Sequence, residues 1–229
     1  MKTIWLFTLS LGLAGCANLP GPSLSAAPIK ACIEPSQEQS LALNVAQELT
    51  NQGRLHAALA HLQTLSPSLV QARLEQAKLM RTLQLAEAKP LYESLLNTCL
   101  AADGHHGLGQ LAAANGSMEK ALLQLKKARD LAPTQAKIRN DLGVAYLGNG
   151  QQDLARFEFL TALELDQHDK QPALNLLALL FYQERLQQAE KMAHRMKFSA
   201  VQVREAQSLA QRLRQGQLAS TVQSEQEGT

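Results

Sequence analysis

The feature that most constrains this sequence is a pattern that recurs at a fixed interval of about 34 residues. A period of this length, with apolar positions at helical spacing inside it, is typical of two antiparallel helices joined by a turn. One helix pair cannot bury its apolar face alone, so neighbouring pairs must stack on each other. The recurring positions are Leu108-Gly109 and Leu142-Gly143, Ala121 and Ala155, and Gly116 and Gly150.

Small residues in this pattern mark the places where we expect two helix backbones to meet. Gly143 is predicted to lie against Ala155, and the equivalent Gly109 against Ala121. Large residues such as Phe159 are expected to fill the space toward the next repeat. The other two glycines of the recurring pattern, Gly116 and Gly150, are expected in the turns between the paired helices.

Residues 136–169 resemble a tetratricopeptide repeat, because Leu142-Gly143, Tyr146, Ala155, Phe159 and Ala162 fall on its consensus positions. Arg139 and Gln167 depart from it, where the consensus places Trp and Pro. The resemblance implies an all-α fold, a right-handed helical solenoid of tetratricopeptide repeats with a C-terminal capping helix. We expect about five helix pairs over residues 37–215, with the best repeats at 102–135 and 136–169, then 170–203, and the capping helix at 200–215. The repeat near 69–101 must be irregular, because the interval from Gly53 to Gly116 falls five positions short of two repeats.

The same resemblance implies a function in peptide binding, since the first helices of such repeats line a concave groove. The groove position two residues before the glycine is often Asn, whose amide can both donate to and accept from an extended backbone. An apolar C-terminal half of the groove would suit an amphipathic helix. Two alternatives stay open: these are ordinary packing or surface positions, or the capping helix itself occupies this surface. The candidate groove residues are Asn44, Asn140, Asp141, Val144, Leu147, Asn175, Ala178, Phe181 and Tyr182, and Gly107 holds the same frame position.

The N-terminus has a short apolar run that is too short to span a bilayer. The residues that follow, Leu13-Ala14-Gly15-Cys16, resemble a bacterial lipobox. This resemblance implies that residues 1–15 are a lipoprotein signal peptide and that Cys16 is acylated, with Ala17 directing the protein to the outer membrane, where it faces the periplasm. The alternative is a plain signal peptide with a chance cysteine. Residues 16–36 are expected to be a flexible linker and residues 216–229 a disordered tail.

Two cysteines remain besides Cys16, namely Cys32 and Cys99. In the oxidising periplasm such a pair is a candidate disulfide that would join the N-terminal segment to the helices near residue 99. The alternative is that both are free thiols.

The sequence offers no credible catalytic, metal or cofactor site. It contains no phosphate-binding loop and no hydrolase or metalloprotease motif. His105 and His106 are adjacent, so on a helix they point about 100° apart and are poorly placed to share a metal ion. The formal net charge of +2 gives no indication of nucleic-acid binding. We therefore expect no enzyme activity and no cofactor.

Residues 100–197 resemble the TadD lipoproteins of the tight-adherence (Flp) pilus machinery, notably in IRNDLGVAYLGNGQQDLARFEFLTALELD and ALNLLALLFYQERLQQAEKMAHRM. The resemblance implies a pilotin-like role: a lipid-anchored scaffold that helps the outer-membrane secretin to assemble or to reach the membrane. Its partner would be the secretin or another pilus-assembly subunit. The alternatives are a pilotin of type IVa pili, or an adaptor that regulates peptidoglycan or lipid synthesis in the envelope.

Overall fold

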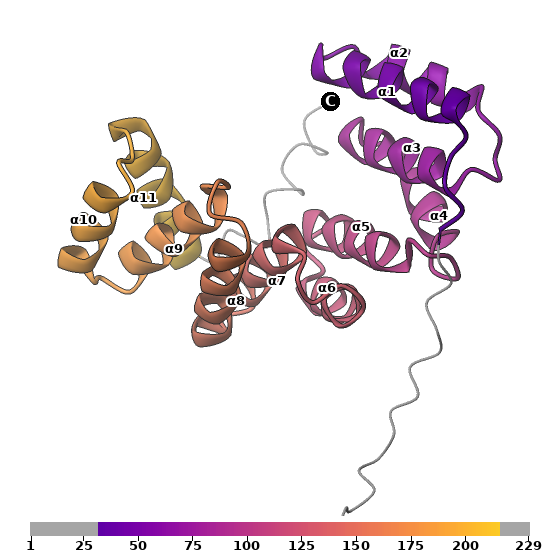
Figure 1. Cartoon of the computed structure of the whole chain (residues 1–229). Helices are drawn as coiled ribbons and strands as arrows, with labels where there is room; N and C mark the ends of the chain where they lie inside the picture. Colours follow the sequence, from indigo (N-terminus) through magenta and orange to yellow (C-terminus); the bar gives the residue numbers. More distant parts are fainter. Residues whose placement is uncertain (1–31, 216–229) are drawn as a thin grey trace, which may run out of the picture.

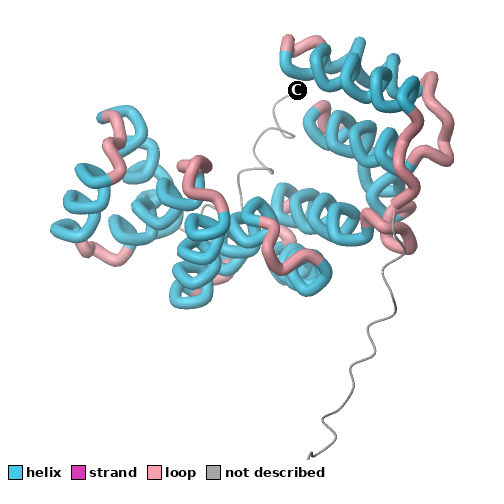
Figure 2. Tube along the Cα trace, viewed as in Figure 1, coloured by secondary structure: helices cyan, strands magenta, loops and turns pink. Residues whose placement is uncertain are grey.

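The computed structural model describes residues 32–215, and within this range every regular element is an α-helix (Figures 1 and 2). The expected all-α solenoid is therefore confirmed. The predicted signal peptide (1–15), Cys16, most of the linker and the tail (216–229) lie outside the described residues. The helices of the described part are α1 (Gln37–Asn51), α2 (Leu55–Gln63), α3 (Val70–Thr82), α4 (Ala88–Glu93), α5 (Ala101–Ala114), α6 (Met118–Leu131), α7 (Ala136–Gly148), α8 (Gln152–Leu165), α9 (Gln171–Tyr182), α10 (Leu186–Arg195) and α11 (Ala200–Arg214).

The helices form successive pairs along a curved row (Figure 1). Along the lower part of this row, α5, α7 and α9 follow the inner edge of the curve, while α6 and α8 follow its outer edge. The best repeats of the sequence correspond to the pairs α5–α6 and α7–α8, with turns at Gly116 and Gly150. The capping helix α11 ends one residue before the predicted boundary at 215.

One turn conformation recurs inside every pair. Its residue of positive φ is glycine at positions 53, 116 and 150, but Gln84 (φ 56°) and Glu184 (φ 59°) occupy the same place in the α3–α4 and α9–α10 turns. In each turn the next residue donates its N–H to a carbonyl five positions back, as Gln151 does to Tyr146 (2.8 Å). This hydrogen bond closes the end of the first helix and reverses the chain.

The irregular second repeat is accompanied by two short helices, α2 with nine residues and α4 with six. The positive-φ residues of these five turns are spaced 31, 32, 34 and 34 apart, so the intervals on either side of the α3–α4 turn together lose the five missing positions. Helix α4 has only six residues, with Pro90 among them, and turns replace a further helical turn up to Leu100. Tyr92 (1% exposed) and Leu95 (0%) nevertheless keep this short unit in the core.

The close approach within each pair differs in detail from the prediction. A Cβ at Gly143 would lie 2.6 Å from Cε1 of Phe159, and a Cβ at Gly109 would lie 2.6 Å from Cγ of Leu125. The large side chain one turn after the small Ala155 or Ala121 therefore covers the glycine of its own pair. The absence of a side chain at Gly143 lets the Phe159 ring pack inside its own pair. The same ring belongs to the buried cluster that includes Ala173 and Leu177 of the next repeat.

The apolar core falls into two clusters that meet at α5. The N-terminal cluster is built from α1 to α4, and Leu108 and Leu111 of α5 pack against it. The C-terminal cluster is built from α6 to α11, and Ala112 and Ala113 of α5 pack against that one. Helix α5 therefore links two halves that each have a core of their own.

A buried ion pair reinforces the C-terminal half. Glu158 of α8 is only 2% exposed. Its Oε2 accepts a hydrogen bond from Nη1 of Arg139 (2.9 Å), and its Oε1 lies 3.5 Å from Nη1 of Arg129. Arg139 also donates Nε–H to the carbonyl of Pro133 (2.9 Å). The arginine that replaces the consensus Trp thus joins the loop before α7 to α8.

Cys32 and Cys99 form a disulfide, with Cα atoms 5.1 Å apart. The sequence left open whether these two cysteines form a disulfide or are free thiols, and the structure has the disulfide. Residues 32–36, predicted as the end of a flexible linker, are held in place by this bond and by a hydrogen bond from Gln71 Nε2 to the carbonyl of Ile33 (3.1 Å). Ser36 then begins α1 with a capping box completed by Gln39.

Candidate functional site

A network of polar side chains crosses the inner side of α5 and α7 and is centred on Asp141. Its Oδ2 accepts hydrogen bonds from His106 Nε2 (2.7 Å) and Gln110 Nε2 (2.7 Å), both on α5. Its Oδ1 accepts a third from Asn140 Nδ2 (3.2 Å). Burial raises the pKa of this carboxyl group, but the hydrogen bond and charge of His106, with the bonds of Gln110 and Asn140, outweigh it, so the pKa of Asp141 is lowered.

The network continues from α7 to α9. Asn175 donates from Nδ2 to Oδ1 of Asn140 (2.8 Å), and Gln171 donates from Nε2 to Oδ1 of Asn175 (3.3 Å). Hydrogen bonds therefore connect the first helices of three successive repeats. Such a network fixes the side chains before any ligand arrives, which lowers the entropic cost of binding.

Three of the network residues, His106, Gln110 and Gln171, were not among the predicted groove residues. His106 had been assigned to packing or surface, yet it pairs with Asp141 across two repeats. The repeat period contained the signal, because His106 stands one repeat before Asn140 and Gln110 stands one repeat before Val144.

The inner side of α5 and α7 is partly accessible at these residues. Val144 of α7 is 40% exposed, and His106, Gln110 and Asp141 are partly accessible. Leu147, predicted to line the groove, is 5% exposed and belongs to the C-terminal core. We call the surface formed by His106, Gln110, Asp141 and Val144 the α5–α7 groove.

The predicted apolar half of the groove on α9 is not available to a partner. Helix α11 packs along α9, and α8 and α10 enclose its other sides, so Asn175, Ala178 and Phe181 are buried and Tyr182 is half-buried. Arg214 of α11 donates from Nη2 to the carbonyl of Phe181, at the end of α9. The prediction of an exposed apolar groove on these residues was wrong, and the alternative that the capping helix occupies the surface describes the structure.

The two remaining groove positions lie apart from the network. Asn44 is exposed on α1, in the N-terminal half. Gly107 faces α4 rather than the groove: a Cβ there would lie 2.1 Å from Cε1 of Tyr92. Position 107 therefore allows the short α4 to approach α5 closely.

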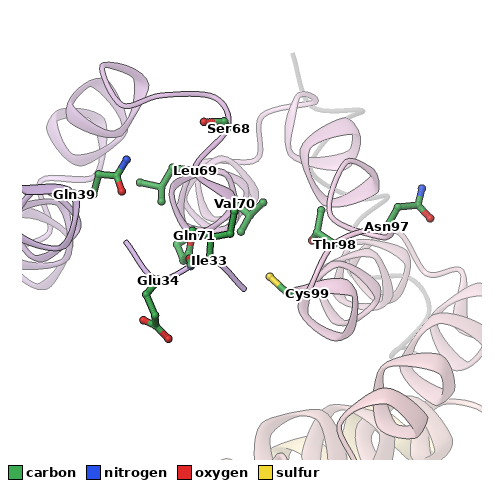
Figure 3. Close-up of a pocket in the computed structure, with 10 residues that line it drawn as sticks. All are labelled: Ile33, Glu34, Gln39, Ser68, Leu69, Val70, Gln71, Asn97, Thr98 and Cys99. Carbon is green, nitrogen blue, oxygen red and sulfur yellow. The ribbon is translucent and has the colours of Figure 1, made fainter. Parts of the chain in front are cut away.

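A second concave feature lies beside the disulfide. It is a cavity of about 310 Å³ whose walls come from the segment after Cys32, the start of α3 and the loop before α5 (Figure 3). Ile33 and Gln71 lie close together on one side in this view, and Thr98 and Cys99 lie on another. Because Ile33 is held there through Cys32, the bond to Cys99 maintains one wall of the cavity. The ten lining residues are Ile33, Glu34, Gln39, Ser68, Leu69, Val70, Gln71, Asn97, Thr98 and Cys99.

Two other histidines, His105 and His61, hydrogen-bond within their own helix pairs. His105 Nδ1 bonds Gln124 Oε1 (2.7 Å), and His61 Nε2 bonds the carbonyl of Ala42 (3.0 Å). Residues 32–215 contain no group of three or more His, Cys, Asp or Glu side chains that could hold a metal ion. The same residues include no helix that is both long enough and apolar enough to cross a membrane.

Comparison with known proteins identifies a relative that matches most of the chain. No protein-family model matches the chain. The chain is 43% identical over 198 residues to the TPR repeat-containing protein PA4299 of Pseudomonas aeruginosa, a match that covers 86% of this chain and 80% of that protein.

Solved structures share the fold at lower identity. The thermophilic TPR protein TTC0263 of Thermus thermophilus superposes with a TM-score of 0.61 at 22% identity, over 78% of this chain and 98% of that one. PilF of Pseudomonas aeruginosa superposes with a TM-score of 0.60 at 18% identity, over 83% of this chain and 97% of that one.

Proposed function

The chain belongs to the tetratricopeptide-repeat proteins, which act as protein-interaction scaffolds, and we propose that it holds a pilus-assembly partner at the periplasmic face of the outer membrane. The proposed partner is the secretin or another subunit of a tight-adherence (Flp) pilus. The proposed role is pilotin-like, assisting the secretin to assemble or to reach the membrane.

The observation that carries this proposal is the preordered α5–α7 groove. Gln110 and His106 present amide and imidazole groups beside the exposed side chain of Val144. An extended segment can use the polar groups for its backbone and place an apolar side chain against Val144. Since α11 covers α9, we expect the bound segment to lie over α5 and α7 and to be shorter than one that spans the whole array.

The proposed location rests on the lipobox-like sequence at Cys16 and on the redox chemistry of the described part. A disulfide between Cys32 and Cys99 accords with an oxidising compartment such as the periplasm. Acylation at Cys16 would leave fifteen residues between the anchor and Cys32, so the first pair of helices could stand off the membrane surface by up to about 50 Å. The pilus assignment rests on the likeness of residues 100–197 to TadD lipoproteins.

Fractionation and co-purification test these proposals separately. For location, the wild-type chain should sediment with outer membranes and Cys16→Ser should be released into the soluble periplasmic fraction; retention of Cys16→Ser in the membrane would contradict the anchor. For the partner, the wild-type chain is cross-linked in its native envelope, purified and analysed by mass spectrometry. Enrichment of the secretin or of a pilus subunit is the expected result. Enrichment of a peptidoglycan or lipid-synthesis enzyme would overturn it in favour of the envelope adaptor.

A further inference from the structure

The outer helices α6 and α8 expose a group of large apolar side chains. Leu123 of α6 is 54% exposed, and Leu154, Phe157 and Leu160 of α8 are 47%, 60% and 42% exposed. Leu123 and Phe157 hold the same position in successive repeats, so we expect them to face the same way. Their helices, α6 and α8, both lie on the outer edge of the row (Figure 1). Clustered apolar side chains on a protein surface indicate a place where another molecule docks.

Charges of opposite sign flank this apolar group. Lys120 and Lys127 lie on α6, and Asp153 and Glu164 lie on α8. All four are exposed, and within residues 32–215 none of them takes part in an ion pair. They therefore keep their full charge available for a partner.

The ion pair between Arg129 of α6 and Glu158 of α8 shows which sides of these helices face each other. At about 100° per residue, Lys120 and Lys127 lie about 160–180° around α6 from Arg129. Asp153 and Glu164 lie about 120–140° around α8 from Glu158. The lysines thus form the edge of the face away from α8. The carboxylates form the opposite edge, away from α6, together with Leu160, which lies about 160° around α8 from Glu158. Leu123, Leu154 and Phe157 lie between these two edges.

Little net charge lies between these two edges. Asp130 of α6 is already paired with Arg129 (2.8 Å). Glu119 and Lys126, also on this side of α6, carry opposite signs. The α6–α8 face, defined as the apolar group with its two charged edges, therefore has one basic edge, an apolar centre and one acidic edge.

We propose that the α6–α8 face binds the same face of a second copy of this chain. A two-fold axis parallel to the helices brings the basic edge of each copy opposite the acidic edge of the other. Lys120 then faces Asp153 of the second copy, Lys127 faces Glu164, and Leu123 packs on Phe157. Both ion pairs occur twice, and the apolar side chains of both copies are removed from water.

This dimer leaves the α5–α7 groove of both copies free, because the groove lies on the opposite, inner side of the row of helices (Figure 1). The dimer is therefore bivalent, which raises the apparent affinity for any target that presents two sites. Self-association does not depend on the identity of the groove partner.

Charge reversal across the two edges provides the test. Two differently tagged copies of the full chain are co-expressed, one copy is captured, and the amount of the other is measured. The α6 variant Lys120→Glu/Lys127→Glu should fail to capture itself, and so should the α8 variant Asp153→Lys/Glu164→Lys, each with a loss of about tenfold or more. Co-expression of the α6 variant with the α8 variant should restore capture, because each edge again meets its opposite charge.

Controls separate this result from misfolding and from the proposed groove function. Circular dichroism should be equal for all variants, and Leu41→Glu, which alters an exposed leucine on α1 (64% exposed), should leave capture unchanged. Phe157→Glu should abolish capture while partner binding by the groove persists in each single copy. The proposal is overturned if wild-type copies do not capture each other, if the two charge variants fail to capture one another, or if the α6–α8 face instead takes up a different protein as a single copy.

Discussion

Removal of the disulfide by Cys99→Ser should destabilise the N-terminal half of the protein selectively. The bond joins residues 67 positions apart and encloses α1 to α4, which share one core cluster. Closing a loop of this length lowers the entropy of the unfolded chain by an amount equivalent to about 4 kcal/mol at 25 °C. Solenoids unfold in parts, so this loss falls on the unit that contains the loop.

Hydrogen exchange followed by mass spectrometry measures this effect helix by helix. In Cys99→Ser, the amides of α1 to α4 should exchange up to about a thousandfold faster, while those of α7 to α9 keep their protection. Cys32→Ser and reduction of the wild-type protein should each give the same result. The double variant Cys32→Ser/Cys99→Ser should lose no more protection in α1 to α4 than either single variant. The reasoning is refuted if the bond is present in the wild-type protein and its removal leaves exchange in α1 to α4 unchanged, or accelerates α7 to α9 equally.

Three further predictions concern the repeats themselves. Glu184→Gly should stabilise the protein by about 0.5–1 kcal/mol in urea unfolding, because glycine adopts the positive φ of this position without strain. Gly150→Ala should destabilise it by about 1–2 kcal/mol for the opposite reason. An unchanged unfolding midpoint for both variants would show that the turn is not strained. Arg139→Ala should lower the free energy of unfolding by about 3 kcal/mol, because it leaves buried Glu158 with only the longer contact to Arg129. Lys78→Ala, which breaks an exposed ion pair with Glu75, should lower it by less than about 0.5 kcal/mol. Equal losses for the two variants would contradict the role of burial. The pKa of Asp141 is lowered in the folded state, so its carboxylate stabilises the fold at pH values above the ordinary pKa of 3.8, and this stabilisation is lost as the pH falls below that value. Asp141→Asn should therefore weaken the dependence of stability on pH in this range, measured by thermal unfolding between pH 6 and about 2.5.

The sequence predicted the central repeats well because they carry their own local signals. Gly116 and Gly150 mark the turns, and Gly109 and Gly143 mark the helix contacts, at one constant period. The neighbouring repeats use Gln84 and Glu184 in the same left-handed turn, so their turns carry no glycine to reveal them. The positions of these two turns can be found only from the way their helices pair in the structure.

The groove was harder to predict because its extent depends on contacts between distant segments. Asn175, Ala178 and Phe181 have the spacing of an exposed groove face, and nothing near them in sequence indicates that α11 returns to cover them. Conversely, His106 looked like a packing or surface residue until Asp141, 35 positions later, was brought beside it. Local periodicity assigns residues to a helix face, whereas tertiary packing decides whether that face meets solvent.

Whether the α5–α7 groove holds a protein partner can be measured with a photo-crosslinking residue placed at Val144 in living cells. Val144 is the exposed apolar member of this groove, whereas Ala178, at 0% exposed, lies under the part of α9 that the chain itself encloses. We expect a cross-link from position 144 to a secretin or pilus-assembly subunit, and none to such a protein from position 178 or from Asn44 on α1. A partner cross-linked from position 44 or 178 but not from 144 would contradict this expectation.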